Sequence, residues 1–198
     1  MKILIIVSIF ISLISPSSIE SDTHRVGDSV WMTKNLNVSE FRNGDEILEA
    51  KSSEEWMNAF ENKTPAYCYY ENDIDNAEKF GKLYNWFAVN DERGLAPEGW
   101  HVATDSEWSS LIEALHGVEK AGIILNDGAF QSVSAGLRDH DGSFNGKGFG
   151  ALYWTSTVDF NFFSYNRQVF SDKNSEVTRG SSHHAMGLSV RCVEDKKR

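Results

Sequence analysis

The clearest helix predicted by the hydrophobic pattern lies between residues 104 and 117. Thr104 precedes it and Glu107 follows three residues later, which is the spacing of a capping box. Gly117 is a natural stop for the same helix. Four apolar residues recur between these ends at the spacing of one helix face: Trp108, Leu111, Ile112 and Leu115. The pattern therefore predicts a capped amphipathic helix with one buried side.

Two further helices and several strands follow from the same kind of pattern. Ser53 precedes EEWMNAFEN, a short helical run that Pro65 keeps from continuing. The run GKLYNWFAVN contains the next helix, marked by Leu83, Trp86 and Phe87. Alternation and turn residues predict hairpins at residues 24–33 and around Asn43–Gly44. Further strands are expected in the ranges 66–72, 100–102, 151–157, 165–170 and 187–193.

The order of these elements predicts an α+β fold. Helices fall in the first half of the chain, and most of an antiparallel sheet comes from the glycine-rich second half. The chain has 198 residues, 40% of them hydrophobic, which suits one well-buried domain. We therefore expect residues 18–198 to form a single domain.

The first 17 residues differ in character from the rest. Lys2 is followed by the 12-residue apolar run 3–14 and then by small polar residues. This is the pattern of a signal peptide, and the run is shorter than the roughly 20 residues that a membrane-spanning helix needs. We expect residues 1–17 to be removed on export to a periplasm, the cell surface or the medium. The alternative is an uncleaved membrane anchor.

The charge of the chain argues against two classes of partner. The formal net charge is −10, and it becomes −11 after cleavage because Lys2 is the only charged residue in 1–17. A chain this acidic is repelled by phosphate backbones and anionic lipid headgroups. We therefore expect neither nucleic-acid binding nor membrane binding once the signal is removed.

Several motifs resemble one known family. GKLYNWFAVN and GLAPEGWHVATDSEW, followed by AFQSVSAGLRDHDGSF, YWTST and GLSVRCV, occur in the order found in the Fibrobacter succinogenes major paralogous domain. The resemblance covers about residues 24–193. It implies a C-type-lectin-like fold, related to the formylglycine-generating enzymes, with two main helices packed on an antiparallel sheet. Between the second helix and AFQSVSAGLR this chain has only residues 123–128, where the family usually has a longer loop.

The two cysteines, Cys68 and Cys192, lie in predicted strands. In an exported protein such a pair usually forms a disulfide, and the resembling family tends to carry cysteines at these two places. We therefore predict a Cys68–Cys192 disulfide. The alternative is a pair of buried free thiols.

Catalytic patterns are weak in this sequence. A formylglycine-type oxidase needs a reactive cysteine pair, but the only two cysteines here are those of the predicted disulfide. The six histidines show no metal-ligand spacing, which argues against a metal-dependent enzyme. His101 is expected to be a packed histidine with a satisfied ring nitrogen. Asp139, Asp141 and Asn145 form an oxygen-rich loop that could hold Ca²⁺, although a plain β-turn explains them as well. No cofactor is expected.

The segment 159–170, DFNFFSYNRQVF, is the best candidate for recognition. It combines aromatic rings with Arg and amide side chains, the composition of a binding surface. The residues expected to be exposed for ligand binding are Asn161, Phe163, Tyr165, Asn166 and Arg167, whereas Phe160, Phe162 and Phe170 are expected in the core.

The sequence thus favours an exported, non-catalytic module that binds an extracellular glycan or protein. The alternatives are an enzyme on the formylglycine-generating-type fold and a structural cell-surface component.

Overall fold

The computed structural model describes residues 22–127, 130, 132–171 and 176–196. The predicted signal peptide, residues 1–17, lies outside this range. Within it, no helix is long and apolar enough to cross a membrane. The helices are α2 (Ser53–Glu61), α3 (Ala77–Phe80), α4 (Trp86–Val89), α5 (Asp105–Ala114) and α6 (Val118–Asn126), with short 3₁₀ turns at Tyr70–Asn72 and Ile74–Asn76.

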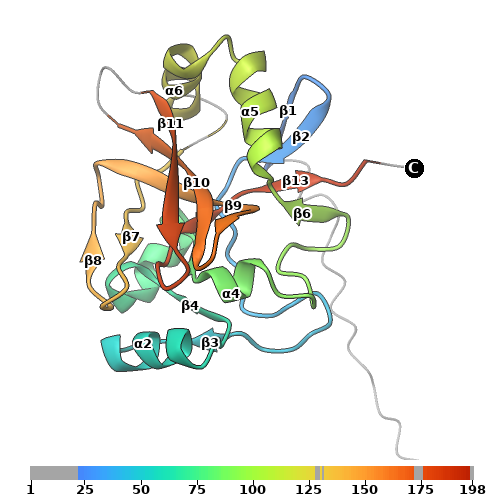
Figure 1. The fold of residues 1–198 in the computed structure, drawn as a ribbon. Coiled ribbons are helices and arrows are strands. Elements are labelled where there is room, and N and C mark those ends of the chain that lie inside the picture. Colours follow the sequence, from blue (N-terminus) through green and yellow to red (C-terminus); the bar gives the residue numbers. More distant parts are fainter. Residues whose placement is uncertain (1–21, 128–129, 131, 172–175, 197–198) are drawn as a thin grey trace, which may run out of the picture.

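The strands form several small sheets, so the α+β prediction is confirmed (Figure 1). The first sheet has the order β1-β2-β13-β6 and contains Thr23–Val26, Ser29–Met32, Cys192–Glu194 and Trp100–Val102. The second has the order β11-β10-β9-β12 and contains Val177–His183, Phe163–Phe170, Gly150–Phe160 and Ser189–Val190. The sheet β3-β4-β5 contains Leu48–Glu49, Ala66–Cys68 and Leu83–Tyr84, and β7 (Leu137–Arg138) pairs with β8 (Phe144–Asn145).

Several local features differ from the sequence-based expectations. Residues 83–89 form the short strand β5 and the four-residue helix α4 instead of one helix, because Leu83 pairs with Cys68 in β4. Residues 118–126 form α6, which the sequence analysis missed, and strand β11 was missed as well. Helix α2 is capped by Ser52 instead of Ser53, with Glu55 completing a capping box.

The N-terminal end of α5 joins several elements. Thr104 and Glu107 form the predicted capping box, and Trp108, Leu111 and Ile112 are buried as expected. Trp108 packs edge-on against Trp31 of β2 with ring centroids 5.0 Å apart, and it stacks on Tyr153 of β9 at 5.3 Å. Helix α5 thereby bridges the first sheet and the second (Figure 1).

His101 of β6 bonds to carboxylates on two other elements. Its Nε2 lies 2.8 Å from Glu107 of α5, and its Nδ1 lies 2.7 Å from Asp195 after β13. The expectation of a packed histidine is confirmed. Hydrogen bonding to Glu107 raises the pKa of His101 against the opposing effect of burial, and Asp195 adds to the increase. Burial favours a raised pKa for Glu107, but hydrogen bonds with His101 and Thr104 outweigh it and lower the pKa to about 2.

The predicted disulfide is wrong, because Cys68 and Cys192 are both free and buried. Cys68 lies in β4 and packs with Trp56 and Leu83, whereas Cys192 lies in β13, in a different sheet and a different hydrophobic cluster. Burial raises the pKa of Cys68 to about 12, against the opposing effect of the Arg138 guanidinium. Burial likewise raises the pKa of Cys192 to about 12.

Thiol titration checks this correction. The native protein is expected to react slowly, because only the thiolate is nucleophilic and both thiols are buried. After denaturation without reductant, both cysteines should react with Ellman's reagent. A denatured protein with no reactive thiol would show that the disulfide forms after all.

The His101 contacts predict a pH-dependent stability. A histidine whose pKa is raised by folding stabilises the fold fully below its unfolded-state pKa, and this contribution is lost as the pH rises through the folded-state pKa. We therefore expect His101→Gln to lower the free energy of unfolding more at about pH 5 than at about pH 9. Denaturant unfolding of both proteins measures this difference. An effect of the substitution that is independent of pH would contradict the assignment.

Candidate functional site

Strand β10 carries four of the five predicted ligand-binding residues, and two of these four are buried. Asn166 is fully buried, and its Nδ2 donates to Ser182 Oγ of β11 at 2.6 Å. Arg167 is also buried, on the opposite face of the strand. The expectation that both are exposed is wrong because β10 is an interior strand, paired with β9 and β11, and α5 packs against it.

Arg167 is held by the start of α5. Its Nη2 donates to Asp105 Oδ1 at 2.6 Å, to the Asp105 carbonyl at 3.0 Å and to Ser109 Oγ at 2.8 Å. Arg179 of β11 donates its Nε to the other carboxylate oxygen of Asp105 at 2.9 Å. The Asp105 amide donates to Thr157 Oγ1 of β9 at 3.1 Å. These groups, which we call the Asp105 clamp, fix α5 to three adjacent strands.

The other three predicted residues reach the surface. Asn161 is exposed in the β9–β10 turn, where it adopts a positive φ of 46°. Phe163 and Tyr165 are half-buried on β10. The guanidinium of Arg179 lies 3.6 Å from the centroid of the Tyr165 ring, and a hydrogen bond with Asp159 raises the pKa of Tyr165. The outer end of β10 is therefore available to a ligand.

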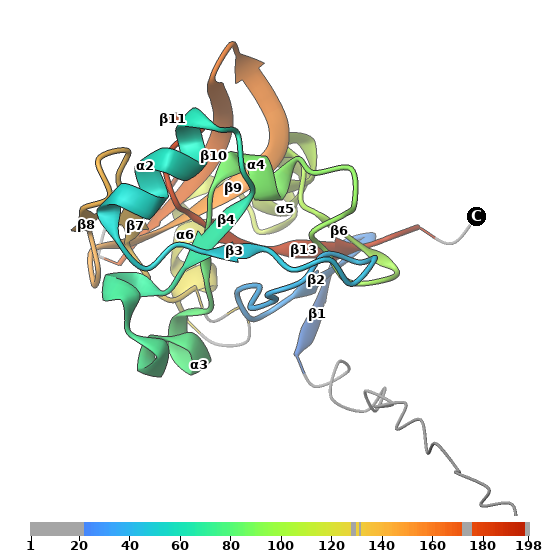
Figure 2. The ribbon, with the colours of Figure 1, turned by 90° about the horizontal axis from the view of Figure 1, so that it is seen from below.

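The predicted core position of Phe160, Phe162 and Phe170 is wrong. Their exposed fractions are 55%, 50% and 38%. Phe160 and Phe162 lie at the end of the β9–β10 hairpin, which extends beyond the neighbouring elements in Figure 2. Register shifts between Phe163 and Asn166 show that the pairing of β9 with β10 is irregular near this end. Alternation along the sequence therefore does not predict which side chains face the core and which face solvent.

The hairpin end joins aromatic residues from two helices. Phe60 of α2 lies 6.5 Å from Phe162 and 6.0 Å from Phe87 of α4 between ring centroids. His183, at the end of β11, lies 4.9 Å from Phe60 and 5.2 Å from Phe163. Phe160 stacks on Phe163 at 5.2 Å. We call this set the tip cluster: Phe60, Phe87, Phe160, Phe162, Phe163 and His183.

Sequence reasoning missed the helical members of the tip cluster. Phe60 is four residues after Trp56, which suggests a shared buried face, but Trp56 is 1% exposed whereas Phe60 at the helix end is half-buried. Phe87 lies in the run WFAV, where every residue is apolar, so periodicity does not predict which side chain is exposed. Both residues join the cluster because α2 and α4 pack beside the hairpin in the fold, and no local sequence pattern predicts that packing.

A hollow of about 500 Å³ adjoins the tip cluster through Phe87. It is lined by Lys63, Pro65, Trp86, Phe87, Asn90, Asp91, Glu92 and His184. His184 stacks on Trp86 with centroids 5.2 Å apart, and its Nε2 lies 2.9 Å from Ser164 Oγ. Burial lowers the pKa of His184 to about 4, so the ring is neutral at neutral pH. Aromatic and polar groups therefore meet in this hollow.

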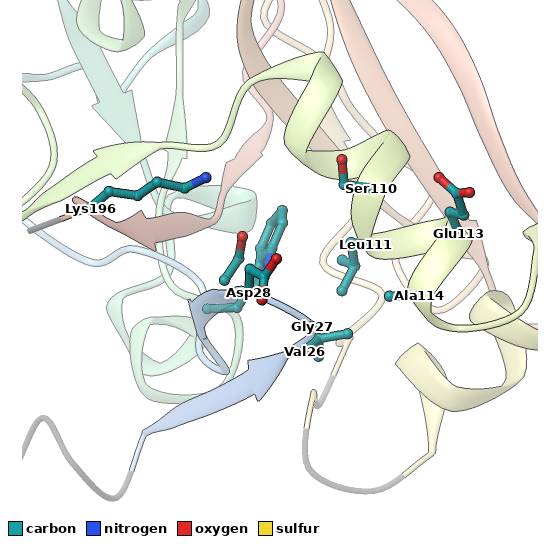
Figure 3. Close-up of a pocket in the computed structure, with 10 residues that line it drawn as sticks. Val26, Gly27, Asp28, Ser110, Leu111, Glu113, Ala114 and Lys196 are labelled. Carbon is teal, nitrogen blue, oxygen red and sulfur yellow. The ribbon is translucent and has the colours of Figure 1, made fainter.

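A second hollow, of about 370 Å³, lies between the β1–β2 turn and α5 (Figure 3). Asp28 lies on the hairpin side, Ser110 and Glu113 lie on α5, and Lys196 lies near the C-terminal end (Figure 3). Its aromatic component, Trp31, is 1% exposed and packs against Trp108, so it offers little ring surface to a ligand. This hollow lacks the aromatic surface that adjoins Phe87.

Of the suggested calcium residues, Asp139 and Asp141 lie in the β7–β8 turn and Asn145 ends β8. Asp139 Oδ1 accepts from the His140 amide at 2.7 Å, and Asp141 Oδ1 accepts from the Ser143 amide at 2.9 Å. Asn145 Nδ2 lies 3.4 Å from Ser143 Oγ. These are the contacts of a β-turn, and calcium binding stays a prediction. In the part of the chain that the structure describes, no three or more His, Cys, Asp or Glu side chains are grouped to hold a metal ion.

Comparison with known proteins gives one match. Searches of curated proteins and of solved structures found no match to this chain. The model of the family described as Fibrobacter succinogenes major domain matches residues 25–194, close to the range of the motif resemblance. The chain therefore belongs to the Fibrobacter succinogenes major domain family.

Proposed function

We propose that this protein is an exported, non-catalytic recognition module that binds an extracellular glycan or protein through the tip cluster. The observation that carries the proposal is the exposure of Phe160 and Phe162, at 55% and 50%, where Phe160 stacks on Phe163 of β10 and Phe162 contacts Phe60 of α2. Grouped exposed apolar side chains mark interaction sites, and aromatic anchors dominate binding energies.

The chemistry of the buried groups supports binding over catalysis. Both cysteines are buried with pKa values raised to about 12, which opposes their use as thiolate nucleophiles near neutral pH. This counts against the alternative of a formylglycine-type oxidase. A structural surface component differs from the proposal in needing no ligand at the tip cluster.

Export and the finer fold belong to the same proposal. The apolar run 3–14 after Lys2 supports a signal peptide over residues 1–17. The family motifs, together with α5 packed on β9 and β10, support a single C-type-lectin-like domain with two main helices on an antiparallel sheet. The partners proposed are extracellular, and the acidic net charge disfavours nucleic acid and anionic membranes.

The double variant Phe160→Ser/Phe162→Ser tests the proposed site. On a glycan and cell-surface-protein array it should weaken the strongest binding by at least ~10-fold, because exposed aromatic anchors are lost. Thermal stability should change little, since both rings are half exposed in the free protein.

Phe149→Ser is the matched control. Phe149 is 78% exposed and directly precedes β9, whereas Phe160 ends that strand. The control should bind like the wild type. Loss of binding in the control, with full binding by the double variant, would place the site at the other end of the hairpin.

A further inference from the structure

The hollow beside Phe87 has a rigid apolar wall. Asn85 caps α4 by accepting the Ala88 amide at 3.0 Å, which fixes Trp86 and Phe87 at the start of the helix. His184 stacks against Trp86 and lies edge-on to Phe87, with centroids 6.2 Å apart. Its bond to Ser164 holds the imidazole in place. Trp86 and His184 are only 2% and 6% exposed, so they support the wall from behind, and the half-buried Phe87 is the ring that faces a ligand. The wall is uncharged at neutral pH and formed before any ligand arrives.

The rim of the hollow supplies unused hydrogen-bonding groups. Lys63, Asn90 and Glu92 are exposed, and within the described residues their side chains make no hydrogen bond or ion pair. Asp91 differs, because both its oxygens bind Arg93, at 2.8 and 2.9 Å. The rim thus offers the Lys63 ammonium as a donor, the Glu92 carboxylate as an acceptor, and the Asn90 amide, which can donate and accept.

The position of Lys63 is fixed by its backbone. It follows the C-cap of α2 with a positive φ of 53°, a place where glycine is the usual residue. Its amide donates to the Phe60 carbonyl at 3.0 Å, and the Thr64 amide donates to the Ala59 carbonyl at 2.7 Å. The ammonium therefore extends from a well-defined turn next to Phe60 of the tip cluster.

The charges around the hollow balance. The two rim charges without an ion-pair partner among the described residues, Lys63 and Glu92, are opposite in sign. Asp91 is paired with Arg93, which also bonds to Asp45 outside the hollow. A ligand therefore gains little from carrying net charge. An apolar side chain of a protein ligand would cover Lys63, Asn90 and Glu92 without replacing their bonds to water, which is costly. A hydroxylated ring replaces those bonds and still places C–H groups on Phe87 and Pro65. The volume of about 500 Å³ lies within the usual range for small-ligand sites.

We infer that this hollow binds a neutral saccharide ring, with Lys63, Asn90 and Glu92 bonding its hydroxyl groups and Phe87 packing on its apolar face. The inference rests on the proposed function, because it names the ligand class for a binding surface that consists of the tip cluster and the adjoining hollow. The tip cluster then contacts whatever the saccharide is attached to, a further sugar or a protein.

Titration of the full chain with methyl glycosides of glucose, galactose, mannose and N-acetylglucosamine tests the inference. At least one should bind saturably with a dissociation constant of about 1 mM or below, detected by calorimetry. The variant Asn90→Ala/Glu92→Gln should weaken that binding ~10-fold or more, since two hydrogen-bonding groups change. Both residues are exposed, so the fold should be kept.

Glu98→Gln is the matched control, because Glu98 is an exposed acid outside the hollow. It should bind like the wild type. The inference is overturned if no glycoside binds saturably up to about 10 mM, or if the Asn90→Ala/Glu92→Gln variant binds as tightly as the wild type. If array binding still depends on Phe160 and Phe162 in either case, the proposed function stands and the ligand class is wrong.

Discussion

The carboxylate of Asp105 is the constraint on which the presentation of the site depends. This carboxylate accepts hydrogen bonds from Arg167 of β10 and Arg179 of β11, and the Asp105 backbone amide donates to Thr157 of β9. Breaking one partner of a buried charge pair leaves the other uncompensated, which is strongly unfavourable. The three strands that lead to the tip cluster are therefore fixed to the rigid start of α5.

This arrangement separates stability from recognition along a single strand. Near the Asp105 clamp, β10 is covered on both faces, so its polar residues serve internal contacts. Toward the turn the cover ends, and Phe160 and Phe162 are about half exposed, with Phe162 beside Phe60 of α2. The hairpin is rigid at its base and exposed at its end, which lowers the entropic cost of holding a binding surface in place.

The sequence predicted the parts of the fold that depend on local signals. The capping box of α5, the β1–β2 turn and the core strands of the second half follow from spacing and turn chemistry. The disulfide was wrong because two apolar strands with cysteines need not be neighbours. The burial of Arg167 and the exposure of Phe162 depend on which elements cover each face, which no local pattern records. Of the candidate site, Asn161 is exposed as expected, Phe163 and Tyr165 are half-buried, and a binding role for all three stays a prediction.

The central claim is that ligand is held at the end of the β9–β10 hairpin. Hydroxyl-radical footprinting, with and without the tightest array ligand, tests it directly, because exposed phenylalanine rings are oxidised and covered ones are protected. Phe160, Phe162, Phe149 and Phe170 should all be oxidised in the free protein, and binding should protect Phe160 and Phe162 but leave Phe149 and Phe170 oxidised. Protection of Phe149 and Phe170, with Phe160 and Phe162 still oxidised, would contradict it.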